Sequence, residues 1–160
     1  MKVAAVQLTS TGNVTENQEL ALAKIREAAG NGARLIVLPE ATAQNFRSGR
    51  LDGQAQTLEG PFATAIQTLA EELEVTVVAG MFCPADTVER DGKTINRVTN
   101  TALIAGPGVL GGYDKIHTYD AFDYRESDTV LAGESLVAFD VDDLVAVSYT
   151  HLRAHETKAN

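Results

Sequence analysis

Several residue types are scarce in this chain, and each scarcity excludes a class of protein. A single cysteine rules out an internal disulfide framework and suits a reducing compartment. Lysine and arginine number 13 against 22 aspartates and glutamates, and the net charge of -9 is opposite to that of a nucleic-acid-binding surface. No apolar run is long enough to span a membrane, and the opening MKVAAVQLTS is too short in apolar residues for a signal peptide. These features predict a soluble, cytoplasmic protein that binds neither nucleic acid nor membrane.

The first forty residues read as a β-α-β unit. With 160 residues, of which 44% are hydrophobic, the chain is long enough for one globular domain. Lys2–Leu8 and Arg34–Leu38 are short apolar runs typical of buried strands. Between them Asn13 is a candidate N-cap, with Glu16 three residues later, for a helix that ends near Gly30. Two strands joined by a helix predict a parallel pair with a right-handed crossover.

The rest of the chain predicts one more helix and a series of strands. Pro61 opens the helix, because proline is favoured in a first turn. A long polar loop, Ala41–Gly60, precedes it. The helix is followed by a strand and by a polar connection with a turn at Asp91–Gly92. Two further strands in antiparallel order and a hairpin that turns at Asp142–Asp143 come next. The expected ranges are Val75–Phe82 for the strand, Pro84–Gly92 for the connection, Ile95–Ala105 and Val109–Tyr113 for the antiparallel strands, and Ser135–Asp140 with Leu144–Val147 for the hairpin.

Two charged residues stand out by their position at strand ends. Glu40 follows Pro39, which stops the second strand, and functional groups of open α/β sheets gather beyond the carboxyl ends of strands. Lys115 lies in the polar stretch Gly111–Ser127, directly after an apolar run, where a held ammonium is useful to chemistry. The plain alternatives are a loop acid or N-cap for Glu40 and a solvated lysine for Lys115. We predict that the two side chains lie close together at one end of the sheet.

Three segments together resemble a known family. Leu35–Glu40 resembles the "vlPE" segment of the nitrilase, or carbon–nitrogen hydrolase, superfamily. Tyr113–His117 is similar to its "Y-x-K-x-H" segment. Glu126–Ser127, followed by Ala132–Gly133, resembles the "ES…pG" segment of the amidase branch. The three agree in order and spacing, and the resemblance runs from Met1 to about Val147.

The resemblance implies a fold, a substrate class and roles for three residues. It implies an α/β protein built as a four-layer α-β-β-α sandwich, homo-oligomeric when full length, that acts without a cofactor on a small amide or nitrile. Glu40 would be the general base, Lys115 the cation that stabilises the oxyanion, and Glu126 the second acid that orients Lys115. The loop Thr118–Asp128 must then fold back over the sheet end to bring Glu126 to Lys115. The nucleophile of the family is a cysteine.

The cysteine is where this chain departs from the family. At the family's "C-Y-D" segment the chain reads Ser148–Tyr149–Thr150, and its one cysteine, Cys83, looks like a small buried hydrophobe at a strand end. We therefore expect residues 1–147 to be the N-terminal part of a carbon–nitrogen hydrolase domain, inactive as written. Residues 148–160 resemble the translated read-through of a sequencing adapter and are interpreted as a non-native tail. His151 and His155 lie four residues apart there, but no third ligand is evident, so no metal is assigned.

Other functions remain as alternatives. A naturally non-catalytic nitrilase-like binding or scaffold protein would also lack the nucleophile. A nucleotide-binding α/β domain is suggested by Gly106–Gly108 and Gly111–Gly112, but a strand follows these glycines where a phosphate site needs a helix N-terminus. Arg47, Arg50 and Arg125 are either ligands for a substrate carboxylate or solvated surface residues.

Overall fold

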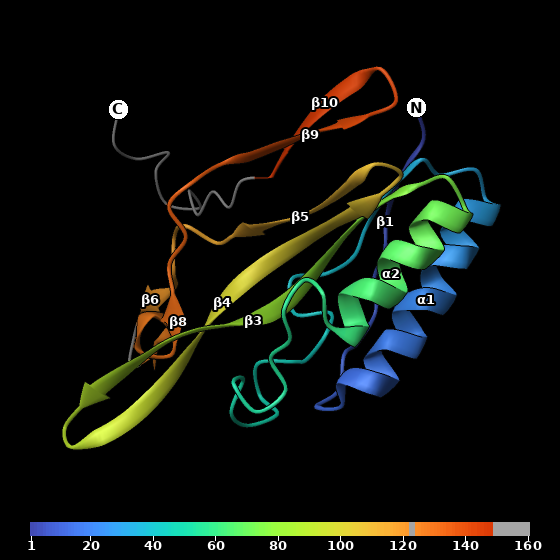
Figure 1. Cartoon of the computed structure of the whole chain (residues 1–160). Helices are drawn as coiled ribbons and strands as arrows, with labels where there is room; N and C mark the ends of the chain where they lie inside the picture. The colour runs from blue at the N-terminus through green and yellow to red at the C-terminus, as the bar shows by residue number, and fades with distance from the viewer. Residues whose placement is uncertain (122–123, 149–160) are drawn as a thin grey trace.

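The core of the molecule is one mixed sheet of six strands (Figure 1). The computed structural model describes residues 1–121 and 124–148. The strand order is β1-β2-β3-β4-β5, with β8 added beside β4. The strands of this main sheet are β1 (Val3–Ala5), β2 (Leu35–Val37), β3 (Thr76–Arg90), β4 (Lys93–Gly106), β5 (Val109–Asp114) and β8 (Val130–Leu131). The mixed α/β class predicted from the sequence is confirmed.

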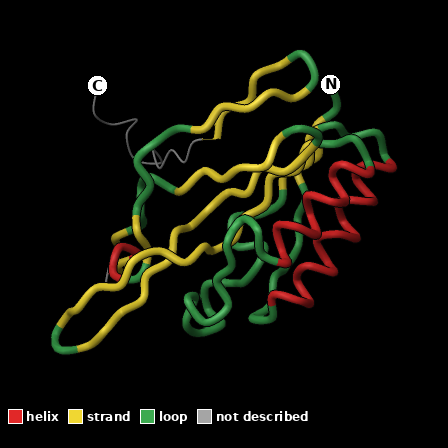
Figure 2. The backbone as a smooth tube through the Cα atoms, viewed as in Figure 1, coloured by secondary structure: helices red, strands yellow, loops and turns green. Residues whose placement is uncertain are grey.

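Two helices cover one face of the main sheet (Figure 2). Helix α1 (Val14–Gly30) begins at Asn13, whose side chain accepts hydrogen bonds from the backbone of Thr15 and Glu16, as the sequence predicts. Helix α2 (Pro61–Glu72) begins at the expected proline. The apolar sides of both helices pack on β1 to β4 in the largest buried cluster of the described residues. The β1 and β2 pairing is parallel, so the predicted β-α-β unit is confirmed.

The antiparallel part of the sheet is longer than the sequence suggests. The expected polar connection Pro84–Gly92 is wrong: β3 continues through Arg90 and turns only at Asp91 and Gly92. The polar residues remain in the strand because they pair with β4 across a bulge between Pro84 and Thr87. The paired polar ends of β3 and β4, from Thr87–Asn96 to Arg90–Lys93, form a distal ladder that extends away from the helices (Figure 1). Neither face of this ladder needs to be apolar, because no helix of the described residues covers it. Strands β4 and β5 are antiparallel, as predicted.

A hairpin lies over the other face of the main sheet. It consists of β9 (Val137–Val141) and β10 (Leu144–Ser148), joined at the predicted turn. Phe139 and Val141 point from it onto Ile104 of β4 in a separate buried cluster. The order helix, sheet, sheet supplies three layers of the expected four-layer α-β-β-α sandwich. A second helical layer is not among residues 1–121 and 124–148.

The segment after β5 folds back toward the main sheet. It contains β6 (Asp120–Ala121), β7 (Tyr124–Arg125) and the short 3-10 helix η1 (Glu126–Asp128), and β8 then joins β4 in parallel. No helix in the described part of the chain is long and apolar enough to cross a membrane. The predicted tail, apart from its first residue Ser148, lies outside the described residues, as do His151 and His155.

Candidate functional site

Glu40 is placed by a loop that crosses over β3. Leu38 still donates to the carbonyl of Val78, as a strand residue would, but Gly80 then donates to the carbonyl of Pro39 at 3.2 Å. Ala43 donates in turn to the carbonyl of Gly80 at 2.9 Å, so the loop lies directly on this glycine. A Cβ atom at position 80 would overlap the Glu40 backbone, so only glycine lets the loop come this close.

Lys115 directly follows β5, and its backbone is held on both sides. Its N–H donates to the carbonyl of Asn100 on β4 at 2.8 Å, and its carbonyl accepts from Gly133 at 2.9 Å. The side chain is nearly buried, and its Nζ lies 3.0 Å from Glu40 Oε1. The predicted proximity of Glu40 and Lys115 is therefore confirmed, although 75 residues separate them.

Glu126 is the most enclosed member of the cluster. Its side chain is 3% exposed, and Lys115 Nζ lies 3.0 Å from Oε2 and 3.3 Å from Oε1. The backbone N–H of Tyr119 also donates to Oε2 at 2.6 Å. Because the Tyr119 carbonyl accepts from the backbone N–H of Glu126, the loop is closed on itself. The prediction that this loop folds back to bring Glu126 to Lys115 is confirmed.

The charges in the cluster keep Lys115 protonated. Burial by itself lowers the pKa of Lys115, but hydrogen bonds from its ammonium to Glu40 and Glu126, and their negative charge, outweigh that effect and raise the pKa above its ordinary value. A fixed ammonium between two carboxylates can polarise a carbonyl or stabilise an oxyanion. The arrangement suits acyl-transfer chemistry better than binding of an anion, because the two carboxylates already exceed the one positive charge.

The sequence interpretation missed Asn100. Its side-chain amide donates to Glu40 Oε1 at 2.7 Å and to Glu126 Oε1 at 3.2 Å. The residue is 4% exposed in the middle of β4. A signal for it exists in the sequence: the polar run Thr99–Thr101 stands between Val98 and the apolar run Ala102–Ala105, and buried polar side chains need partners.

Cys83 lies on the wrong face of the sheet to serve this cluster. It pairs with Thr99, whereas Asn100 pairs with Phe82, and neighbouring residues of a strand point to opposite faces. The thiol therefore faces the helices, where it packs against the main core. Burial is the largest effect on the Cys83 thiol and raises its pKa, so it stays protonated near neutral pH. Cys83 is partly rather than fully buried, and this packing agrees with the predicted small hydrophobe rather than with a nucleophile.

The three arginines considered from the sequence are spread over the molecule. Arg50 lines a cavity of about 550 Å³ beside the distal ladder, but it is paired with Asp52 at 2.5 Å. Arg125 is exposed and lies 3.9 Å from Asp128, and Arg47 is exposed in the long loop. None of the hydrogen bonds or ion pairs found among the described residues joins them to the cluster, so their role toward a substrate stays a prediction.

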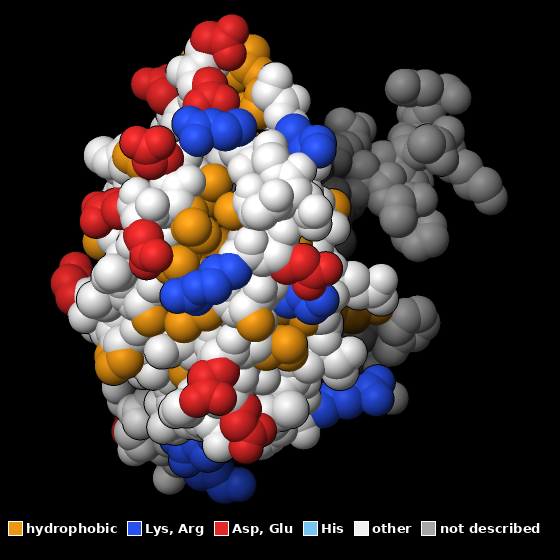
Figure 3. All heavy atoms as spheres, turned by 90° about the vertical axis from the view of Figure 1, so that its right-hand side faces the viewer, with side chains coloured by type: hydrophobic (Ala, Val, Ile, Leu, Met, Phe, Trp, Pro, Cys, Tyr) orange, Lys and Arg blue, Asp and Glu red, His pale blue; other side chains and the backbone are white. Residues whose placement is uncertain are grey.

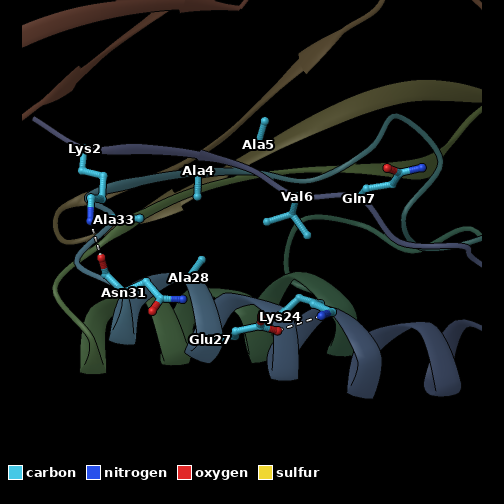
Figure 4. Close-up of a pocket in the computed structure, with 10 residues that line it drawn as sticks. All are labelled: Lys2, Ala4, Ala5, Val6, Gln7, Lys24, Glu27, Ala28, Asn31 and Ala33. Atoms are coloured by element: carbon cyan, nitrogen blue, oxygen red, sulfur yellow. Dashed lines mark hydrogen bonds and ion pairs between the residues drawn. The ribbon is translucent and has the colours of Figure 1, made fainter.

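A second cavity, of about 280 Å³, lies between β1 and α1 (Figure 4). Its two ammonium groups are already engaged, since Lys2 donates to the Asn31 carbonyl and Lys24 pairs with Glu27, both at 2.7 Å. The helical side of the molecule, in Figure 3, carries scattered acidic and basic groups with apolar surface between them. Among residues 1–121 and 124–148, no three His, Cys, Asp or Glu side chains gather in a way that could hold a metal ion.

Comparisons with known proteins agree with the fold. The family model described as carbon-nitrogen hydrolase matches residues 2–150. "Hydrolase Rv0480c" of Mycobacterium tuberculosis is 41% identical over 147 residues, covering 89% of this chain and 49% of that protein. "Deaminated glutathione amidase" of Synechocystis sp. is 38% identical over 143 residues, with 82% and 49% covered. The chain thus spans about half the length of the curated relatives it matches.

Solved structures show the same architecture. XC1258 from Xanthomonas campestris, described as a CN-hydrolase superfamily protein, superposes with a TM-score of 0.72 at 23% identity, over 89% of this chain and 50% of that one. An amidase from Nesterenkonia sp. superposes with a TM-score of 0.67 at 19% identity, over 88% and 51%. At these identities the likeness establishes the fold.

Proposed function

Because this chain belongs to the carbon–nitrogen hydrolase family, we propose that the cluster of Glu40, Lys115 and Glu126 is the catalytic centre of an amide- or nitrile-cleaving enzyme. The observation that carries the proposal is the buried ammonium of Lys115 held at 3.0 Å from both carboxylates. The names of relatives, hydrolase and deaminated glutathione amidase, support an amide as the substrate.

The two carboxylates differ in ways that support different roles. Both oxygens of Glu126 accept hydrogen bonds, and the side chain is enclosed, so it serves to hold Lys115 charged and oriented. Glu40 accepts from Lys115 and Asn100 through Oε1 alone. Its side chain is 53% exposed, and Oε2 makes no hydrogen bond with the described residues. Glu40 is therefore the general base, acting through Oε2.

Lys115 stabilises the oxyanion. Its ammonium has three hydrogens, and the 3.3 Å contact with Glu126 Oε1 is the longest of its three contacts. A substrate carbonyl oxygen competes most easily for that hydrogen. Since the ammonium is fixed before substrate arrives, the developing negative charge is stabilised with little reorganisation.

The nucleophile in this proposal is a cysteine outside these 160 residues. Glu40 accepts the thiol proton as sulfur attacks the amide carbon, and it returns that proton to the nitrogen as the carbon–nitrogen bond breaks and ammonia leaves. Water, deprotonated by Glu40, then attacks the thioester carbon; the carbon–sulfur bond breaks, the acid leaves, and Glu40 returns the proton to the sulfur. In a mutant of the amidase from Nesterenkonia sp., which shares this fold, acrylamide adds to the active-site cysteine, and this supports a cysteine nucleophile. Cys83 faces the other side of the sheet and is not used.

The test compares the 160-residue chain with a protein in which residues 1–147 are followed by their natural continuation. We expect ammonia release from short amides only by the longer protein, with loss of turnover in Glu40→Gln and Lys115→Met variants. A matched control is Glu59→Gln, an acid in the long loop whose hydrogen bonding among the described residues involves its backbone carbonyl, which accepts from Thr64, and not the cluster. Turnover that survives Glu40→Gln would overturn the proposed centre. A continuation without any cysteine, together with no turnover, would favour the non-catalytic binding or scaffold alternative.

A further inference from the structure

Asn100 touches every member of the charged cluster. Its backbone carbonyl accepts from the N–H of Lys115 at 2.8 Å. Its side-chain Nδ2 donates to Glu40 at 2.7 Å and to Glu126 at 3.2 Å. A side-chain amide has two N–H hydrogens, and here each is directed to a different carboxylate. One residue in the middle of β4 thus links the loop after β2, the end of β5 and helix η1.

The contact with Asn100 matters most for Glu40. This residue comes from a loop, and its side chain is the most exposed of the three. Among the described residues, its carboxylate is held only by Lys115 and Asn100, both through Oε1. Two donors on Oε1 fix the plane of the carboxylate and direct Oε2 away from the cluster. Without the shorter of these two contacts, the carboxylate can rotate about its last bond and exchange its oxygens.

We propose that Asn100 is a positioning residue, which holds Glu40 and Glu126 on either side of Lys115 and selects Oε2 of Glu40 as the proton acceptor. The inference deepens the proposed function and rests on it for its catalytic meaning. Ionised carboxylates only accept hydrogen bonds, so the group between them must be a donor. An amide supplies two donors without charge. An aspartate of the same shape would place a third negative charge there, and a leucine would supply no donor.

The first experiment measures the pKa of Lys115 by NMR titration of selectively labelled lysine in the 160-residue chain. In Asn100→Leu, the Lys115 pKa falls, because Glu40 is released while the burial of Lys115 remains. In Asn100→Asp the Lys115 pKa rises, because a third carboxylate faces the ammonium. The control Asn96→Leu lies on the same strand, where its side chain contacts Asp52 and Thr87 instead, and it leaves the Lys115 pKa unchanged.

Opposite shifts in the two variants distinguish positioning from packing. If both Asn100 variants lower stability and neither moves the Lys115 pKa, Asn100 is only a packed strand residue and the inference is wrong. Should Asn100→Leu fail to fold, Asn100→Asp carries the test, because it has the shape of asparagine. The unfolding free energy that Asn100→Asp loses relative to the unsubstituted chain becomes smaller as the pH falls, since a protonated carboxyl is again a donor. A deficit that is independent of pH contradicts the inference.

The second experiment separates this inference from the proposed function. In the longer, thiol-bearing protein, Asn100→Leu lowers kcat by about 100-fold with little change in KM, since a misplacement of about 1 Å can cost that factor. Asn100→Asp also lowers kcat near neutral pH, because an ionised carboxylate supplies no donor to Glu40. If the Lys115 pKa shifts as expected but the longer protein releases no ammonia, the positioning role stands and the proposed function is wrong. If the longer protein releases ammonia and both Asn100 variants keep the same kcat, the proposed function stands and the positioning role is wrong.

Discussion

At the scale of single residues, Cys83 shows how one strand register decides the chemistry of a side chain. The thiol lies on the helical face, and burial raises its pKa. We expect it to react more slowly with a disulfide reagent in the folded chain than in the urea-unfolded chain at the same pH, because only the thiolate attacks. The measurement is the rate of thiol modification followed by absorbance. Equal rates in both states would show that the thiol is accessible and ionised.

Gly80 is the other residue that the site depends on. A methyl group there would overlap the Glu40 backbone, so Gly80→Ala should lift the loop from β3 and separate Glu40 from Lys115. We expect a loss of about 2 kcal/mol of unfolding free energy, typical of overpacking, together with a lower Lys115 pKa. Urea unfolding and lysine NMR measure the two effects. The control is Gly30→Ala, where a Cβ meets nothing within 4 Å; a similar loss there would refute the steric argument.

At the scale of elements, the hairpin β9–β10 is held by its apolar side. Phe139 and Val141 are buried against the main sheet, whereas the Arg34–Asp142 ion pair at its turn is largely exposed. We expect Phe139→Ala to lower the unfolding free energy by about 3 kcal/mol, as in other buried aromatic truncations. Asp142→Asn should change it little, because water and salt screen exposed pairs. Urea unfolding of both variants measures the two losses. A larger loss in Asp142→Asn than in Phe139→Ala would show that the ion pair, not the apolar side, holds the hairpin.

The elements were predicted to different degrees, for a physical reason. Both helices were found from local signals, since the Asn13 cap and Pro61 act within one turn. The hairpin turn at Asp142–Asp143 was also local, and Asp142 adopts the positive φ of 53° that such turns need. The length of β3 was not predicted, because its polar half is stabilised by pairing with β4 rather than by its own composition.

At the scale of the whole molecule, the outer face of the hairpin is unusually apolar. Val145 is 68% exposed and Val147 is 59% exposed, on the side of β10 opposite to the packed Phe139. Exposed sheet faces are normally polar, and unpaired apolar strands promote association. We expect the 160-residue chain to associate as its concentration rises, and Val145→Glu with Val147→Glu to suppress this. Light scattering measures it.

The control for that experiment places the same charges elsewhere. Thr64→Glu with Thr68→Glu adds two carboxylates to exposed positions of α2, where no strand edge is involved. If this control suppresses association equally, net charge rather than the hairpin face is responsible. The predicted homo-oligomer of the full-length protein and its cytoplasmic location both stay predictions, as do the boundary at residue 147 and the non-native character of the tail.

The sequence by itself determined the class of fold and the two helices, because caps and proline positions act locally, and the family resemblance of short segments such as Leu35–Glu40 pointed to the three charged residues. Only the tertiary structure decided that Asn100 joins them and that Cys83 does not. Both residues lie on long neighbouring strands, and the face each one occupies follows from the register between β3 and β4. Register is set by pairing across the sheet, and a shift of one residue would exchange the two faces.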